Sequence, residues 1–152
     1  LHLGARGLGL LSAAPGFGSL FGSLALASLG DFRGKGKVLL ISGGVMGLAL
    51  VGFSNARHFA PAFLFLIVVE AARRSLIITS QTLVQTNCED AYRGRMMAMY
   101  MMTIGFMPLG TLPAGAMADA WGVPITLTLQ GGLMAAIFAG LWLARSKVRA
   151  MD

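Results

Sequence analysis

Five long apolar stretches dominate this sequence and leave only short segments between them. They cover approximately residues 8–30, 38–54, 59–85, 96–118 and 123–144. A helix needs roughly 20 predominantly apolar residues to cross about 30 Å of hydrocarbon. None of the stretches alternates apolar and polar residues as the strands of a membrane barrel do. Because a backbone in lipid must satisfy its own hydrogen bonds, we expect an all-α membrane protein with five transmembrane helices.

The composition excludes several other classes of protein. Of the 152 residues, 12% are charged and 56% are hydrophobic, whereas soluble domains have about 25% and about 45–50%. A single cysteine, Cys88, excludes a disulfide-stapled module and a cysteine metal cluster. His2 and His58 have no third ligand near them in the sequence. We therefore expect no metal site and no other cofactor.

The basic residues between the stretches predict how the chain is oriented. With five spans, eight of these residues lie on one side and two on the other; the eight are Arg33, Lys35, Lys37, Arg93, Arg95, Arg145, Lys147 and Arg149. Positively charged loops stay in the cytoplasm, so we expect a cytoplasmic C-terminus in a plasma membrane, which in a bacterium is the inner membrane. Membrane lipid is then the partner of these charges. Nucleic acid is not expected, because its binding would need exposed aromatic residues among the basic ones.

Small residues and prolines recur within the stretches. Small residues four positions apart predict close helix packing, and the pairs are Gly18 with Gly22, Gly43 with Gly47, and Ala136 with Gly140. Prolines remove backbone donors and favour bends; the candidate bending residues are Pro15, Gly105, Pro108, Gly110, Pro113 and Gly115. Two interpretations stay open, namely packing alone or bent helices that line a cavity and rock between states.

A charged cluster interrupts the third stretch near its centre. Glu70, Arg73 and Arg74 would each cost about 2.5–3.5 kcal/mol if they lay unpaired at mid-bilayer. At about 100° per residue they share one helix face with Gln81 and Gln85, which should look into a bundle or a wet cavity. Glu70 and Arg74 have the spacing of a helical ion pair. Either that pair is structural, or Glu70 titrates a proton or binds a cation in a transport pathway, where Arg73 or Arg74 holds an anionic group.

The segment from the end of the first stretch to the start of the second combines glycines, an acid and a basic loop. It reads Gly22-Ser-Leu-Ala-Leu-Ala-Ser-Leu-Gly-Asp-Phe-Arg-Gly-Lys-Gly-Lys37. This segment resembles the cytoplasmic-loop signature G-x-L-x-D-R-x-G-R-[RK] of the major facilitator superfamily, with Phe32 in place of the usual arginine. Asp31 lies where a span meets water. A carboxylate at this position can cap the N-terminus of a neighbouring helix, a contact that stabilises the protein by about 0.3–1 kcal/mol. We expect a latch that favours one access state, with candidate residues Gly22, Asp31, Arg33, Gly34, Lys35 and Lys37.

A second segment, from Gln81 to Gly122, carries a longer pattern. It contains Arg93-Gly94-Arg95, which we add to the latch candidates, and continues through Gly105-Phe-Met-Pro-Leu-Gly110. It is similar to the pattern of the siderophore- and drug-exporter-like branch of that superfamily, the branch of enterobactin exporters. The resemblance implies that the chain is helices eight to twelve of twelve, in a partial C-terminal six-helix half whose N-terminal partner half is missing.

The resemblance also implies a function. A secondary active transporter of this branch would export a small organic solute, drug-like or siderophore-like, by alternating access. Protons would be the coupling ion, the solute would be the small-molecule partner, and the fragment alone would be inactive. Two alternatives stay open: a small membrane-embedded structural or assembly subunit, and a membrane-bound lipid-modifying enzyme. We do not expect an enzyme, because the one acidic pair, Glu89 and Asp90, has no partner histidine or further acid nearby.

Overall fold

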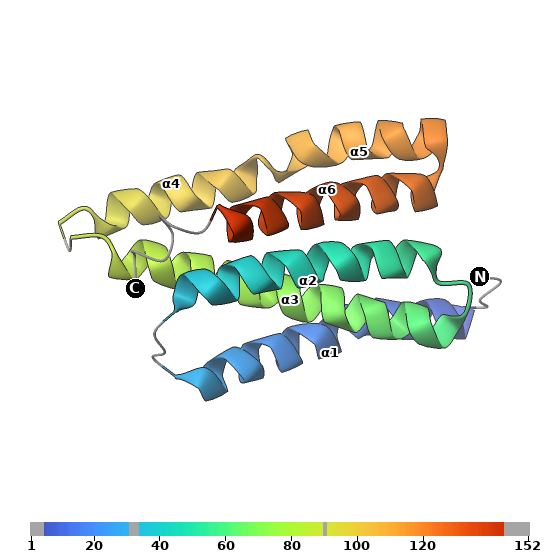
Figure 1. The fold of residues 1–152 in the computed structure, drawn as a ribbon, viewed down its shortest axis with the longest axis horizontal. Coiled ribbons are helices and arrows are strands. Elements are labelled where there is room, and N and C mark those ends of the chain that lie inside the picture. Colours follow the sequence, from blue (N-terminus) through green and yellow to red (C-terminus); the bar gives the residue numbers. More distant parts are fainter. Residues whose placement is uncertain (1–4, 31–33, 90, 145–152) are drawn as a thin grey trace.

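Long antiparallel helices lying side by side make up the structure, a computed structural model that describes residues 5–30, 34–89 and 91–144 (Figure 1). The helices are α1 (Ala5–Leu29), α2 (Lys35–Asn55), α3 (Phe59–Thr86), α4 (Arg93–Gly105), α5 (Met107–Trp121) and α6 (Val123–Leu143). No strand occurs within these ranges. The all-α prediction is therefore confirmed.

Four helical stretches are long and apolar enough to cross a membrane within the described residues. They are Gly9–Ser28, Lys35–Asn55, Arg93–Trp121 and Val123–Leu143. The 28-residue helix α3 has sufficient length but carries Glu70, Arg73 and Arg74 near its middle. Its charges set it apart from the other helices.

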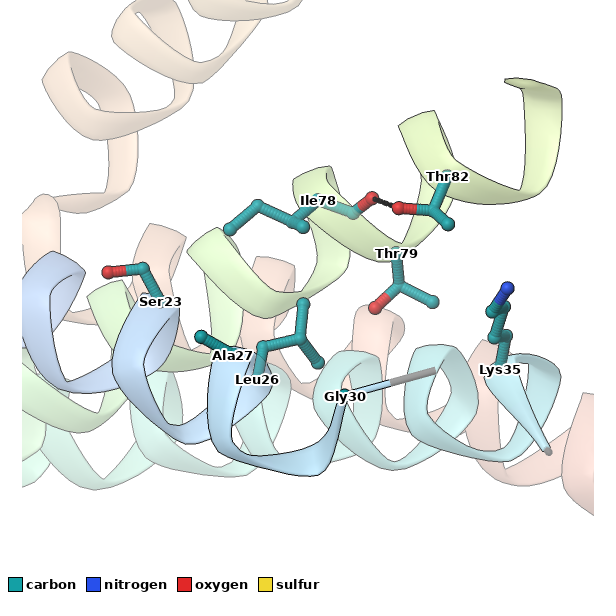
Figure 2. Close-up of a pocket in the computed structure, with 8 residues that line it drawn as sticks. All are labelled: Ser23, Leu26, Ala27, Gly30, Lys35, Ile78, Thr79 and Thr82. Atoms are coloured by element: carbon teal, nitrogen blue, oxygen red, sulfur yellow. Dashed lines mark hydrogen bonds between the residues drawn. The ribbon is translucent and has the colours of Figure 1, made fainter. Parts of the chain in front are cut away.

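The helices pack in an order that differs from their order along the chain. Helix α1 packs on α3, α3 on α2, α2 on α6 and α6 on α5, while α4 contacts α3 and α5. Helices α1 and α2 follow each other in sequence, yet within the described residues they share no contact. A cavity of about 480 Å³ lies where they diverge, and residues of α3 line its remaining side (Figure 2).

Glycines bring the helix backbones close together at two crossings. A Cβ atom on Gly18 of α1 would lie 2.5 Å from the Ile67 carbonyl oxygen of α3. One on Gly47 of α2 would lie 2.6 Å from the Ala135 nitrogen of α6. The small-residue packing predicted for these two glycines is confirmed. The third predicted pair stays a prediction, because a Cβ on Gly140 would meet nothing within 4 Å among the described residues.

The fourth stretch, expected as one helix over 96–118, is two helices that meet at Phe106. Pro108 lacks the N–H that would bond the carbonyl four residues earlier, and Gly105 has a low helix propensity. The Leu109 nitrogen instead donates to the Phe106 carbonyl oxygen at 3.0 Å, which starts the new helix. Pro15 and Pro113 do not interrupt α1 or α5.

Two segments expected as basic loops belong largely to helices. Helix α2 already begins at Lys35 and α4 at Arg93, so Lys37 and Arg95 lie in first turns. Lysine or arginine at a helix N-terminus opposes the helix dipole, and sequence rules therefore placed these helix starts too late. The starts of α2 and α4 lie at the same end of the bundle as the ends of α3 and α6 (Figure 1).

Candidate functional site

The predicted polar face of α3 lies away from the residues that α3 buries most deeply and is partly covered by α1. The residues that α3 buries are Ala62, Val69, Ala72 and Thr79. At about 100° per residue these lie between about 180° and 280° from Glu70 around the helix. The polar residues within about 60° of Glu70 are Arg73, Arg74, Gln81 and Gln85. The structure thus keeps the five predicted residues together on one face.

Helix α1 covers a neighbouring side of α3. A Cβ on Gly18 would lie 2.7 Å from the Glu70 Cβ, and one on Gly22 would lie 2.5 Å from the Ala71 carbonyl oxygen. Ala71 is about 100° from Glu70, so α1 crosses one edge of the polar face and covers part of Glu70 itself. The absence of a side chain at Gly18 is what allows Glu70 to sit beneath α1.

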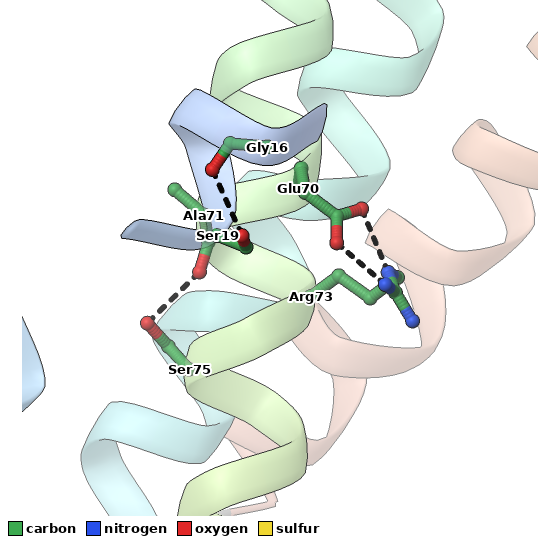
Figure 3. Close-up of polar contacts among 6 residues, drawn as sticks. All are labelled: Gly16, Ser19, Glu70, Ala71, Arg73 and Ser75. Atoms are coloured by element: carbon green, nitrogen blue, oxygen red, sulfur yellow. Dashed lines mark hydrogen bonds and ion pairs between the residues drawn. The ribbon is translucent and has the colours of Figure 1, made fainter. Parts of the chain in front are cut away.

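Glu70 forms a two-pronged ion pair with Arg73 (Figure 3). The Arg73 Nε donates to Glu70 Oε2 at 2.8 Å, and its Nη2 donates to Oε1 at 2.5 Å. The Glu70 side chain is 13% exposed and that of Arg73 is 37% exposed. Bidentate pairing of this kind is among the stronger charge-assisted contacts in proteins.

The expected pair between Glu70 and Arg74 is not formed, and the position of α1 supplies the reason. Arg74 leaves α3 on the side of Ala71, which α1 covers, while Arg73 leaves it on the other side. Arg74 is half-buried and has no hydrogen-bond or ion-pair partner within the described ranges. The face therefore holds a neutral pair and one additional positive charge that is available to an anion.

The polar face connects to α4 at the end of α3. Gln85 is exposed, and its Nε2 donates to the Met97 Sδ at 3.9 Å. Met99 and Met102 of α4 are more than 60% exposed. Flexible methionines fill irregular gaps and adapt to varied apolar partners. The α3–α4 end of the polar face thus offers both amide and thioether groups.

A comparison with known proteins decides the family. The sequence profile described as Major Facilitator Superfamily matches residues 1–151 of this chain. The chain belongs to the Major Facilitator Superfamily. This assignment makes it an integral membrane protein of a transporter family and not an enzyme. No solved structure matches the chain significantly.

One relative of this chain is named a staphyloferrin A transporter, from Staphylococcus aureus (strain NCTC 8325 / PS 47). It is 25% identical over 125 residues, which is 81% of this chain and 31% of the relative. The chain therefore spans about a third of the length of the curated relative that it matches.

The predicted latch of this Major Facilitator Superfamily chain is only partly described. Asp31 and Arg33 lie outside the described residues, and Gly34 precedes α2 with a left-handed φ of 103°. Gly22 lies within α1 and packs on Ala71 rather than in the loop. The basic residues of the second segment start α4, and α4 shares no contact with α2 in the described part of the chain. The latch remains a prediction.

Sequence reasoning missed two features. Gly131 of α6 lies against Gly47, since a Cβ on Gly131 would be 2.7 Å from the Gly47 carbonyl oxygen. Its spacing from Ala135, four residues on, was the same signal that identified the other pairs. The hydroxyls of Ser54 on α2 and Thr128 on α6 also share a hydrogen bond of 2.5 Å, for which a single sequence gives no signal.

Proposed function

We propose that this chain is the C-terminal part, helices eight to twelve, of a proton-coupled exporter of a small organic solute of siderophore-like or drug-like character. Its superfamily membership supports a secondary transporter, and the similarity to a staphyloferrin A transporter supports a siderophore-like solute. The motifs around Asp31 and Arg93 support the position within the longer protein. An N-terminal half completes the solute-binding site in a bacterial inner membrane, with the C-terminus in the cytoplasm.

The charged face of α3 carries this proposal. Glu70 and Arg73 form an ion pair within the helix bundle, and Arg74, which has no partner among the described residues, lies beside it. Ionisable groups within the membrane are expensive and mark ion or substrate pathways. In our proposal Arg74 holds an anionic group of the solute, and Glu70 carries the transported proton.

Exchange of protons for solute requires that the proton and the solute occupy the Glu70 site in turn. The ionised Glu70 carboxylate accepts a hydrogen bond from a donor group of the solute and holds Arg73. Protonation removes the negative charge, releases Arg73 and weakens the hold on that donor group. Gln81 and Gln85 supply further hydrogen-bonding groups along the same face. The bundle then reopens on the other side of the membrane by alternating access.

A conservative substitution tests the role of the carboxylate. Glu70→Gln, made in the complete gene, keeps the shape of the side chain but removes the titrating group. We expect proton-driven solute uptake into inverted membrane vesicles to fall to background while the amount of folded protein is unchanged. Glu89→Gln is the matched control, because Glu89 is exposed beyond the end of α3. Unchanged proton-driven uptake in the Glu70 variant would refute the proposal.

Substitution of the two arginines distinguishes a role in transport from a purely structural ion pair. Arg74→Gln should raise the KM for an anionic solute and leave the folded amount unchanged. Arg73→Gln should destabilise the protein, because a buried carboxylate that loses its partner costs about 3–5 kcal/mol. Restored stability and restored transport in the double variant Glu70→Gln with Arg73→Gln would show that the pair is structural only.

A further inference from the structure

The cavity between α1 and α2 lies outside the charged face of α3. It forms where the end of α1, the start of α2 and the last third of α3 meet (Figure 2). Its lining residues are Ser23, Leu26, Ala27, Gly30, Lys35, Ile78, Thr79 and Thr82. Thr79 is nine residues beyond Glu70, or about 900° of helical rotation, which places it on the opposite side of α3. Ile78 and Thr82 lie about 80° and 120° from Glu70, so the cavity begins beside the polar face and does not include its residues.

Thr79 contributes an unsatisfied hydroxyl to this cavity. The residue is only 2% exposed, and its Oγ1 has no hydrogen-bond partner among the described residues. The other hydroxyls of the lining are satisfied within their own helices, since Thr82 donates to the Ile78 carbonyl at 2.9 Å and Ser23 to the Leu20 carbonyl at 3.0 Å. Figure 2 shows the Thr79 hydroxyl directed into the space between α3 and α1. A buried hydroxyl without a partner is costly, and an acceptor atom in the cavity would remove that cost.

The two ends of the cavity differ in polarity. Leu26, Ala27 and Ile78 provide apolar walls, whereas Lys35 stands at the other end (Figure 2). Lys35 is also the first residue of the 21-residue helix α2, whose cap residue Gly34 offers no side-chain hydrogen bond. The first N–H groups of a helix and its dipole favour an anion. The cavity thus suits a molecule with an anionic head and an apolar body.

The position of the cavity indicates the source of such a molecule. It lies where one membrane helix ends and the next begins, which is the level of the lipid headgroups in a bilayer. Basic pockets between transmembrane helices at this level bind anionic headgroups. A soluble anion would leave the apolar walls without a partner, whereas a phospholipid fills both ends.

We propose that this cavity binds one anionic phospholipid. Its phosphate lies at Lys35 and the start of α2, an ester carbonyl accepts the hydrogen bond of Thr79, and the beginning of an acyl chain lies along Leu26, Ala27 and Ile78. The site rests on the placement of the chain in a membrane and is independent of the transport proposal. A Glu70→Gln variant would accordingly retain the lipid even if it loses transport.

Native mass spectrometry of the complete protein in detergent, titrated with phosphatidylglycerol or phosphatidylcholine, tests the site. We expect tighter binding of phosphatidylglycerol than of phosphatidylcholine. Lys35→Gln should weaken phosphatidylglycerol binding by about two- to tenfold and remove the preference between the two lipids. Thr79→Val should weaken the binding of both lipids, because both carry the ester carbonyl. Ala27→Trp should fill the cavity and abolish the bound species.

Matched controls lie in the same turns of α2 and α3. Lys37→Gln removes a charge that does not line the cavity, and Thr82→Val removes a hydroxyl that is already bonded to Ile78. Both should bind phosphatidylglycerol as the unmodified protein does. Inorganic phosphate at millimolar concentration should not displace the lipid. Equal binding of the two lipids, an Ala27→Trp variant that still binds, or displacement by phosphate alone would each overturn the proposal.

Discussion

The helices α1, α2, α3 and α6 are joined differently from the broken pair α4 and α5. In the first group, glycines let backbones touch, as Gly47 and Gly131 do between α2 and α6. The second pair has no close glycine contact: a Cβ on Gly105, Gly110 or Gly115 would meet nothing within 4 Å. Its large side chains point outward, with Leu109 63% and Leu112 71% exposed.

This difference separates two sources of stability in a membrane protein. Lipid tails are as apolar as leucine, so helices associate through close packing of small residues and through interhelical hydrogen bonds. The first group has both kinds of contact within this chain. In our proposal, the outward side chains of α4 and α5 have their partners in lipid or in the further helices of a longer transporter.

The largest effect should come from joining the two short helices. Pro108→Ala restores an N–H donor, and proline is disfavoured by about 3 kcal/mol inside a helix. We expect α4 and α5 to become one straight helix. Spin labels at the exposed positions Met99 and Leu112 should then move apart, as electron paramagnetic resonance distances would report. A distance that equals that of the protein with Pro108 would show that the proline does not cause the break.

A smaller effect, a loss of stability, is expected where the backbones of α2 and α6 touch. Gly47→Ala places a Cβ 2.6 Å from the Ala135 nitrogen, and backbone atoms cannot move aside. Overpacking of this kind costs about 1–3 kcal/mol. Thermal unfolding in detergent should detect it as a lower melting temperature. Gly44→Ala, one turn earlier and in open space, is the control, and an equal loss there would remove close packing as the reason.

The hydrogen bond between Ser54 and Thr128 should contribute less. Interhelical hydrogen bonds in membrane proteins average about 0.6 kcal/mol. Ser54→Ala should therefore lower the free energy of unfolding by about that amount. A double-mutant cycle with Thr128→Val isolates the pair, and a coupling energy of zero would contradict the bond at 2.5 Å.

The smallest effect should lie in α5. Gly110→Ala adds a methyl group that meets nothing, so the free energy of unfolding should change by less than about 0.5 kcal/mol. The same melting experiment measures it. A loss as large as that of Gly47→Ala would mean that another helix of the complete transporter packs against α5 as closely as α6 packs against α2.

The fold was largely predictable because one requirement dominates it. An apolar run of about 20 residues in lipid has to be a helix, so α1, α2, α3 and α6 lie close to the expected ranges. The break at Phe106 was less predictable. Pro15 and Pro113 lie within continuous helices, and the sequence does not distinguish them from Pro108.

The candidate site was predictable as a face but not as a set of contacts. Helical spacing places Arg73 and Arg74 at similar angles from Glu70, so either could pair with it. The choice depends on α1, which crosses α3 where Gly22 meets Ala71, 49 residues further along the sequence. The cavity at Thr79 depends on the divergence of α1 from α2, which no local pattern encodes.

The contact between Gly47 and Gly131 has a mechanical consequence. Side chains between two helices can change rotamer and let the helices slide, whereas touching backbones leave nothing to rearrange. Helices α2 and α6 should therefore move as one rigid body during a conformational change. Bending would then concentrate at Phe106, where the break between α4 and α5 already interrupts the helix.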